Sequence, residues 1–270
     1  KISEIDDFGQ RFPGSIRKTY RLETLIKALL ETNQTFDSLV SDFDAAVENS
    51  IKRDGCSSFK SVIAYRSGLD IKKVTEGEAR KDFDTRADQM VWFGPYVKNL
   101  RDFLIRRALV KSIDLQAPFL IHAGLGDTDI VATKCNPALL TDLLKDDEVL
   151  PATVILIHGG FPYTYEAGWL ANVLPNVYFE LSSSLPPYME PPVSARRFGE
   201  VLQWVPLVKL VYGSDSSDFP ETAWYYAKVA KKAMAKALGE LVESGDLTIA
   251  EAQQEGENIF YNNAKKLFSI

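Results

Sequence analysis

Two histidines carry the clearest chemical signal in this sequence, and they are the only two among its 270 residues. His122 ends the apolar run "PFLIH", His158 ends the run "TVILIH", and a glycine follows each of them within two residues. Asp215 comes directly after a third run, "LVYGS". Imidazole and carboxylate groups are ligands of borderline divalent cations such as zinc. One histidine at a strand end is more often structural, but the repeated placement favours a metal-binding or catalytic site. We call the region where these strand ends meet the mouth.

Six short runs, most of them apolar, predict the strands that would position these side chains. They cover approximately residues 15–23, 58–66, 118–123, 152–158, 176–182 and 207–213. Helical segments separate the runs, and this alternation is typical of a parallel α/β sheet covered on both faces. The carboxyl ends of parallel strands open on one face, so His122, His158 and Asp215 are expected to converge there. No linker or internal repeat interrupts the pattern, which predicts one domain over residues 1–270.

The number of strands leaves two explanations open. The chain forms either an open sheet of six strands or an eight-stranded α/β barrel without its first two strands. Such a barrel typically needs about 250 residues or more. The first residue is Lys1 rather than methionine, which is compatible with a processed or shortened chain.

Four further residues are candidate substrate contacts. Arg66 would end the strand 58–66, and its planar, permanently charged guanidinium suits a substrate carboxylate. Regular alternation places Lys60 on the same face, where it could touch a metal or form a structural ion pair. The same alternation points Tyr65 to the opposite face and makes it the weaker candidate. Glu221 opens a predicted helix close enough to the mouth to contact substrate.

The composition limits the classes of partner. The net charge is −6 and no run of Lys or Arg resembles a nucleic-acid footprint, so no nucleic-acid partner is expected. The longest apolar stretch is too short and too polar to cross a bilayer, so no membrane partner is expected. Two cysteines are too few for a disulfide framework and are typical of a reducing compartment. We expect a cytoplasmic protein with a small-molecule substrate, and a homo-oligomer is an open alternative.

Several segments together resemble a known family. They are "FKSVIAYRSGLDI", "IHAGLGDTDI" with "NPALL", "FPYTYEAGWLA", "DFPET" and "NIFYNNAKKLF". In this order they resemble the amidohydrolase-related (amidohydrolase 2) group of metal-dependent TIM barrels, which includes aminocarboxymuconate-semialdehyde decarboxylase relatives. Within it, they are most similar to the barrel fused to glutamine-synthetase-like domains in nodulin-type proteins. The resemblance covers nearly the whole chain, from about Arg21 to Ile270.

The resemblance implies a TIM-type (β/α)8 barrel that lacks its first two strands in this chain. The first strand of the family normally ends in a His-x-His pair that supplies two metal ligands. This sequence has no such pair, because its two histidines are assigned to the fifth and sixth strands. The expectation is therefore an N-terminally truncated sequence, and the alternative is a degenerate relative that has lost its metal.

The resemblance also implies residue roles. His122, His158 and Asp215 would be the metal ligands, and Asp215 and His158 would be the catalytic residues. Asp215 would act as general base on a water bound to zinc, or to manganese as the second choice. Arg66, Tyr65, Lys60 and Glu221 would then bind substrate.

The expected reaction is metal-dependent hydrolysis of an amide-type C–N bond in a small carboxylate-bearing substrate. By analogy with the fused proteins, a γ-glutamyl or related nitrogen compound is a candidate substrate. Two alternatives stay open: a metal-dependent non-oxidative decarboxylase of the same family, and a non-catalytic barrel used for binding or assembly.

Overall fold

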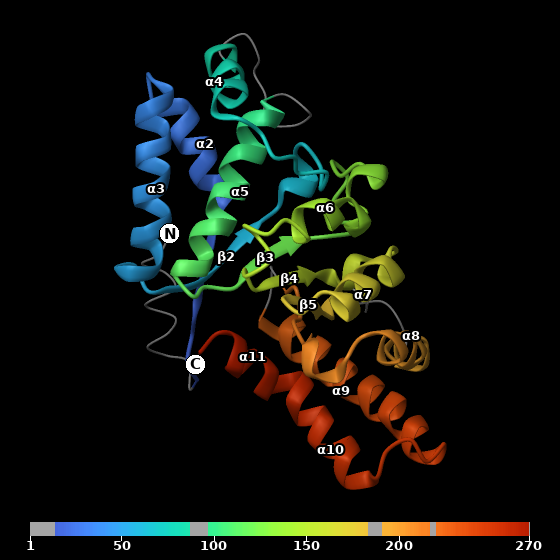
Figure 1. The fold of residues 1–270 in the computed structure, drawn as a ribbon. Helices are drawn as coiled ribbons and strands as arrows, with labels where there is room; N and C mark the ends of the chain where they lie inside the picture. The colour runs from blue at the N-terminus through green and yellow to red at the C-terminus, as the bar shows by residue number, and fades with distance from the viewer. Residues whose placement is uncertain (1–13, 87–96, 183–190, 217–219, 270) are drawn as a thin grey trace.

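The computed structural model describes residues 14–86, 97–182, 191–216 and 220–269 (Figure 1). Its strands are β1 (Lys18–Arg21), β2 (Cys56–Ser61), β3 (Phe119–His122), β4 (Val154–Ile157), β5 (Val177–Glu180) and β6 (Leu210–Val211). Its α-helices are α2 (Leu22–Thr32), α3 (Phe36–Lys52), α4 (Glu76–Asp84), α5 (Lys98–Asp114), α6 (Thr141–Leu144), α7 (Thr164–Val173), α8 (Pro191–Trp204), α9 (Pro220–Glu243), α10 (Ile249–Glu257) and α11 (Asn263–Leu267). Shorter turns include η1 (Ile63–Tyr65), η4 (Pro137–Leu140), η5 (His158–Gly160) and the π-helical η8 (Asn258–Asn262).

The six strands form one parallel sheet in strictly sequential order, β1-β2-β3-β4-β5-β6. Every neighbouring pair is parallel, and in the register of β3 on β4 His122 lies opposite Ile157. A doubly wound sheet would reverse its order at a switch point, whereas sequential parallel strands joined by helices are the order of a TIM-type barrel. The described sheet is thus a barrel-type α/β sheet in which β1 and β6 each pair with one described neighbour.

The alternating side chains of the sheet enter two apolar clusters. One face contributes to the main core beneath the helices and includes Phe119, Ile121, Val154, Leu156 and Phe179. The opposite face carries a smaller cluster, formed by Leu120, Ile155, Ile157, Tyr178 and Val211, against which Ala264, Leu267 and Phe268 pack. The C-terminal helix α11 therefore covers part of the face on which a barrel would have its interior.

Capping residues fix where two of the helices begin. Thr75 and Glu78 form a capping box at the start of α4, and Thr248 and Glu251 form another at the start of α10. In each box the threonine oxygen accepts the N–H of the glutamate, and the glutamate accepts the N–H of the threonine. A cap of this kind stabilises a helix by about 1 kcal/mol.

All six predicted strands are confirmed, although each one observed is shorter than predicted. The prediction was wrong at the end of the strand 58–66, because β2 ends at Ser61 and the chain turns into η1. The Ser61 hydroxyl donates to Glu23 at 2.7 Å and accepts the N–H of Ile63 at 3.2 Å. The N–H of Ile63 is thus bonded to a side chain, as in local turns that compete with sheet pairing. Tyr65 and Arg66 consequently lie beyond the strand.

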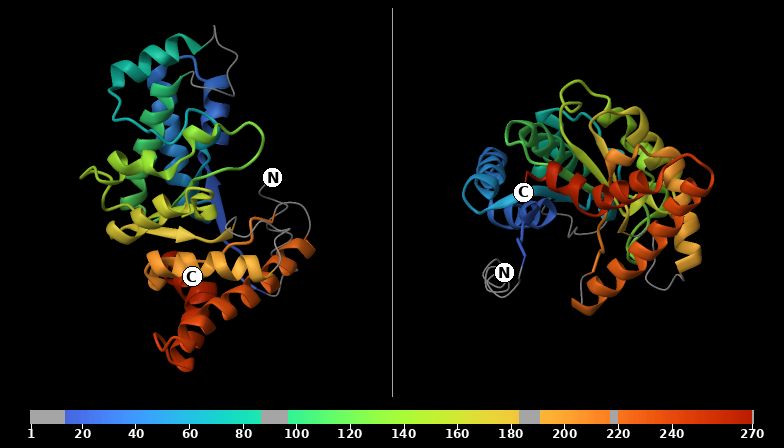
Figure 2. Two further views of the ribbon diagram at one scale, coloured as in Figure 1. Left: turned by 90° about the vertical axis from the view of Figure 1, so that its right-hand side faces the viewer. Right: turned by 90° about the horizontal axis from the view of Figure 1, so that it is seen from below.

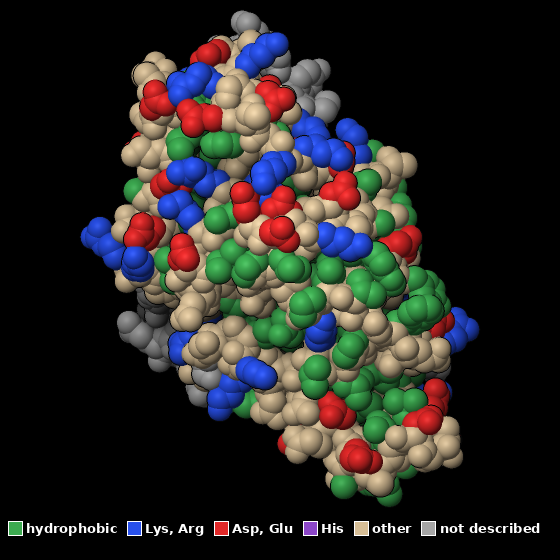
Figure 3. Space-filling view, viewed as in Figure 1, with side chains coloured by type: hydrophobic (Ala, Val, Ile, Leu, Met, Phe, Trp, Pro, Cys, Tyr) green, Lys and Arg blue, Asp and Glu red, His purple; other side chains and the backbone are tan. Residues whose placement is uncertain are grey.

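The remaining elements are arranged around this sheet. Figures 1 and 2 show the C-terminal helices α9, α10 and α11 together at the end of the molecule opposite α4. On the face shown in Figure 3, basic and acidic side chains are interspersed in the upper half, and apolar side chains gather in the lower half. Within the described ranges, no helix combines the length and the apolar character needed to cross a membrane.

Candidate active site at the carboxyl end of the sheet

The two histidines meet at the carboxyl end of the parallel sheet. His122 is the last residue of β3, and His158 follows the last residue of β4. Their ring centroids lie 4.5 Å apart, with the ring planes at 61°. Both side chains are buried, with 5% and 4% of their residue surfaces exposed. The register of neighbouring strands, rather than any local sequence feature, brings the two imidazoles together.

Both imidazoles are neutral at physiological pH. Burial, and then the nearby ring of His158 and the charge of Lys60, lower the pKa of His122 from 6.5 to about 3. Burial, and then Lys60, lower the pKa of His158 to about 3. The Nε2 atom of His122 is buried and has no hydrogen-bond partner among the described residues. A neutral imidazole with an unsatisfied buried nitrogen is the state in which histidine binds a metal ion.

Asp215 lies beside His158 at the same mouth. Its Oδ2 atom is 3.6 Å from Nδ1 of His158, and its side chain is about half exposed, at 49%. Both residues have left-handed backbone conformations, with φ of 52° for Asp215 and 68° for His158. Such conformations are unfavourable for residues other than glycine and are concentrated at functional sites. The structure thus brings His122, His158 and Asp215 to one place, as the sequence predicts.

A buried carboxylate completes this cluster, and sequence reasoning missed it. Glu180 ends β5, and its Oε2 accepts the backbone N–H of His158 at 3.0 Å and the Ser182 hydroxyl at 2.8 Å. Its Oε1 accepts the N–H of Ser182 at 2.9 Å. Burial raises the pKa of Glu180 to about 7, against these three hydrogen bonds, which lower it. One signal was available, since Glu180 ends the run "VYFE" in the way that His122 ends "FLIH".

Tyr65 has a more central position than predicted. Its ring packs on His122 with centroids 4.6 Å apart, and its hydroxyl oxygen accepts the N–H of Asp127 at 3.1 Å. The expectation that Tyr65 points away from the mouth was wrong, because it assumed a regular strand where the chain forms η1. Arg66 contacts the loop after β3, since its Nη1 is 3.6 Å from Oδ2 of Asp129. The loop after β3 therefore contacts both residues.

The other two predicted substrate contacts differ in position. Lys60 pairs with Leu120 in the sheet register, so it projects from the face that also carries His122. Its charge is close enough to lower the pKa of both histidines. Glu221 lies in the first turn of α9 and is exposed. Among the contacts of the described residues, none joins Glu221 to the histidines.

The loops that follow the two histidines are packed directly on each other. Gly124 has a φ of 84°, and a Cβ built on it would lie 2.3 Å from the carbonyl oxygen of Phe161. The N–H of Leu125 donates to that carbonyl oxygen at 2.7 Å. Only glycine allows this approach, and the contact fixes the position of one histidine loop relative to the other.

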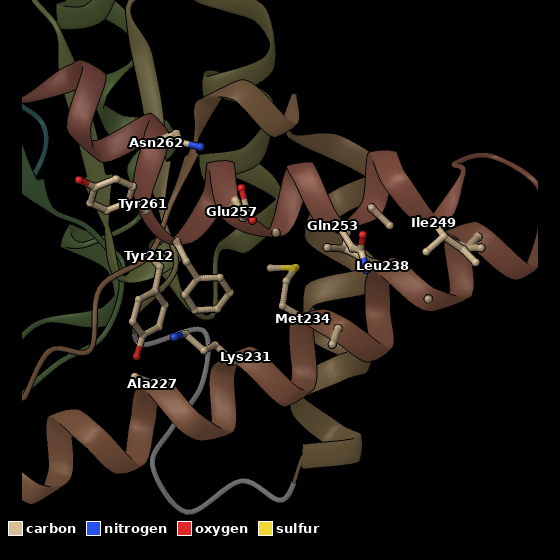
Figure 4. A pocket seen from close by; sticks show the side chains of 16 residues that line it. Tyr212, Ala227, Lys231, Met234, Leu238, Ile249, Gln253, Glu257, Tyr261 and Asn262 are labelled. Atoms are coloured by element: carbon tan, nitrogen blue, oxygen red, sulfur yellow. The ribbon is translucent and has the colours of Figure 1, made fainter.

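A groove lies away from this mouth, between α9, α10 and η8 (Figure 4). It has a volume of about 800 Å³ and a mostly apolar lining that includes Met234, Leu238 and Phe260, and neither histidine contributes to it. Tyr212 stands at one end of the groove. Burial, and then the nearby charge of Glu180, raise the pKa of Tyr212 to about 12, so this phenol is neutral.

Comparison with known proteins identifies the family. Residues 80–270, more than half of the chain, match the family described as amidohydrolase. This chain belongs to the amidohydrolase family. The resemblance seen in the sequence is thereby confirmed. The amidohydrolase-family chain is also 30% identical over 295 residues to the protein fluG of Emericella nidulans, covering 99% of its own length and 34% of that relative. It thus spans about a third of the curated relative that it matches.

Solved structures give the same fold. A protein from Lactobacillus casei ATCC 334 proposed to be a metal-dependent hydrolase is 28% identical, with a TM-score of 0.88. The match covers 98% of the amidohydrolase-family chain and 68% of that protein. A uronate isomerase from Thermotoga maritima, 14% identical, matches with a TM-score of 0.69 over 91% of this chain and 57% of the isomerase. At that identity the isomerase supports the barrel-type fold alone.

The donor atoms fit a metal ion in kind, although the set is incomplete. The neutral imidazoles, the unsatisfied Nε2 of His122 and the carboxylate of Asp215 are the donor types that divalent ions such as zinc bind. Among the described residues, however, no three histidine, cysteine or acidic side chains are grouped so that they could hold a metal ion. The described residues therefore supply donor types that suit a metal ion, without grouping three of them around one position.

Proposed function

We propose that this amidohydrolase-family chain is part of a metal-dependent hydrolase that cleaves an amide-type C–N bond in a small, carboxylate-bearing substrate. The observation that carries the proposal is the buried Nε2 of His122, which has no partner within the described part of the chain. It lies beside His158 and Asp215 at the carboxyl end of a parallel sheet. A buried polar atom without a partner costs about 1–3 kcal/mol, which a bound ligand would offset. Family membership and the similar metal-dependent hydrolase support the same reaction class.

His122 and Asp215 would hold the metal, with His158 beside them. Zinc is the first choice and manganese the second, because neutral imidazole and carboxylate ligands suit both. Since four ligands are usual for zinc, donors outside the described residues would complete the set. A divalent ion bound there would polarise the scissile carbonyl group and lower the pKa of a water molecule.

Side chains of this chain would transfer the protons and bind the substrate. Asp215, with half of its side chain exposed, is placed to accept a proton from the attacking water and to pass it to the leaving nitrogen. His158 would sit at the metal site, next to the reacting carbonyl oxygen. Arg66 would bind the substrate carboxylate in exchange for its contact with Asp129. Tyr65 would line the mouth next to His122.

Lys60 and Glu221 have secondary roles in this proposal. Lys60 faces the same interior as His122, and its ammonium would attract an anionic substrate. Glu221, exposed at the start of α9, would contact the part of the substrate farthest from the bond that breaks.

Metal content tests the proposal. The purified chain is loaded with zinc, dialysed and analysed by elemental mass spectrometry, beside the variants Asp215→Ala and His122→Gln. We expect both variants to retain at least tenfold less zinc than the wild type. Asp42→Ala, which removes an exposed carboxylate of α3, serves as the matched control and should retain zinc. Equal zinc in all four proteins would place the metal elsewhere and overturn the proposal.

A substrate panel tests the reaction. N-acyl amino acids and γ-glutamyl amides are incubated with the zinc-loaded chain, and released amine and carbon dioxide are both measured. Amine release that is lost in Asp215→Ala supports hydrolysis. Carbon dioxide release from planar acidic substrates would instead identify a decarboxylase. A folded, metal-free protein without either product would identify a non-catalytic barrel.

A further inference from the structure

A buried chain of hydrogen bonds runs from β5 to the ring of His158. Oε2 of Glu180 accepts the Ser182 hydroxyl at 2.8 Å, and the Ser182 oxygen lies 2.7 Å from Nδ1 of His158. All three residues are buried, with at most 8% of their surfaces exposed. Gly213 makes room for the carboxylate, because a Cβ at that position would lie 2.2 Å from its Oε1.

The direction of these hydrogen bonds follows from counting protons. Glu180 is the acceptor in all three of its hydrogen bonds, from the N–H of His158, the N–H of Ser182 and the Ser182 hydroxyl. A serine hydroxyl carries only one hydrogen. Ser182 therefore donates its hydrogen to Glu180 and has only lone pairs left for the imidazole. The short contact with His158 is then satisfied only if Nδ1 carries a hydrogen and donates it. Asp215, whose Oδ2 is 3.6 Å from the same Nδ1, also favours a hydrogen on that nitrogen.

We propose that Glu180 and Ser182 are positioning residues that hold His158 in the tautomer with a hydrogen on Nδ1, so that Nε2 presents its lone pair. The significance of this tautomer for catalysis rests on the proposed function, whereas the tautomer itself is a property of the chain. An orienting partner on one ring nitrogen is the usual way in which a protein sets the role of the other. Here Ser182 links the ring to Glu180, because it bonds to both while the carboxylate itself does not contact the ring.

The backbone supports the same assignment. Glu180 also accepts the N–H of His158, whose φ of 68° is left-handed. One carboxylate therefore holds both the backbone and, through Ser182, the ring of this histidine. A neutral imidazole carries hydrogen on one of its two nitrogen atoms, so a donating Nδ1 leaves Nε2 bare.

The experiment is a nuclear magnetic resonance measurement of the tautomer. Because the sequence has two histidines, ¹⁵N-histidine labelling yields four ring nitrogen signals, and His122→Gln assigns those of His158. The whole chain is measured with a chelator at pH 8.5, where histidine and glutamate side chains are ordinarily deprotonated. We expect the ¹⁵N shift of a protonated nitrogen for Nδ1 of His158 and that of a bare nitrogen for Nε2. The reverse pattern, or an even mixture, in the wild type would overturn the proposal.

Variants test the source of the preference. In Ser182→Ala the preference for Nδ1 should fall, and the two nitrogen shifts should move towards each other. Ser182→Thr keeps the hydroxyl and should restore the wild-type shifts. Ser194→Ala removes a buried hydroxyl that has no partner among the described residues, and should change neither shift. Unchanged shifts in Ser182→Ala would overturn the role of Ser182, and the wild-type spectrum remains decisive if that variant does not fold.

Zinc titration separates this inference from the proposed function. If Nδ1 carries the hydrogen and zinc does not bind, the positioning role stands and the metal-dependent reaction fails. If zinc binds and Nδ1 is bare, the proposed function stands and the positioning role fails.

Discussion

The two buried imidazoles should make the protein unstable in mild acid. The pKa of His122 is about 3 in the folded protein and about 6.5 when exposed, because burial disfavours the charged ring. Between these pH values the unfolded chain binds a proton that the folded protein excludes. The contribution of His122 is thus fully present above pH 6.5 and is lost as the pH falls towards 3.

The size of the effect follows from the linkage relation. At pH 5, which is 1.5 units below the unfolded value, one such histidine costs about 2 kcal/mol relative to pH 8. This value depends little on the folded pKa, since pH 5 lies well above 3. Glu180 acts in the opposite direction, because its pKa is raised from 4.5 to about 7 and its contribution is lost as the pH rises through 7. The pH dependence of the total free energy of unfolding therefore combines two opposite contributions.

A comparison with His122→Gln isolates the contribution of His122. Urea unfolding is measured at pH 8 and pH 5 in the presence of a chelator, which removes any contribution from metal binding. Between these pH values the wild type should lose about 2 kcal/mol more stability than the variant. Lys232→His, which adds an exposed imidazole on α9, is the control and should follow the wild type. Parallel curves for wild type and His122→Gln, within about 0.5 kcal/mol, would refute the reasoning.

Two further predictions concern the surroundings of the histidines. Gly124→Ala should destabilise the protein by about 1–3 kcal/mol, because alanine is strained at the left-handed φ of this position and its Cβ would lie 2.3 Å from the carbonyl oxygen of Phe161. Thermal unfolding measures this loss, and an unchanged melting temperature would contradict it. Lys60→Met should raise the pKa of both imidazoles, as followed by ¹⁵N shifts during a pH titration. Since burial is the larger cause, both values should stay below 6.5, and a lowered pKa in the variant would show that Lys60 is not the neighbouring charge.

The sequence was sufficient to locate the strands and most of the chemistry. Apolar runs indicated β3, β4, β5 and β6, because a strand buried on both faces needs mostly apolar side chains. Alternation indicated β1, and β-branched and aromatic residues indicated β2. Polar residues at the ends of such runs are exceptions to that pattern, so His122, His158 and Asp215 were visible as candidate site residues. Their meeting at one edge follows from parallel strand order.

The tertiary structure decided which neighbours these residues have. Tyr65, rather than Arg66, packs on His122, because β2 ends at Ser61 and the chain turns into η1. At that end the Ser61 hydroxyl donates to Glu23, 38 positions away, and no local pattern encodes this bond. Glu180 likewise acquires its role from distant partners, since burial sets its pKa and the backbone of His158 donates to it. Side-chain type and spacing along the chain thus determined which groups reach the mouth, whereas packing between strands determined their protonation and hydrogen bonds, which depend on burial and distance.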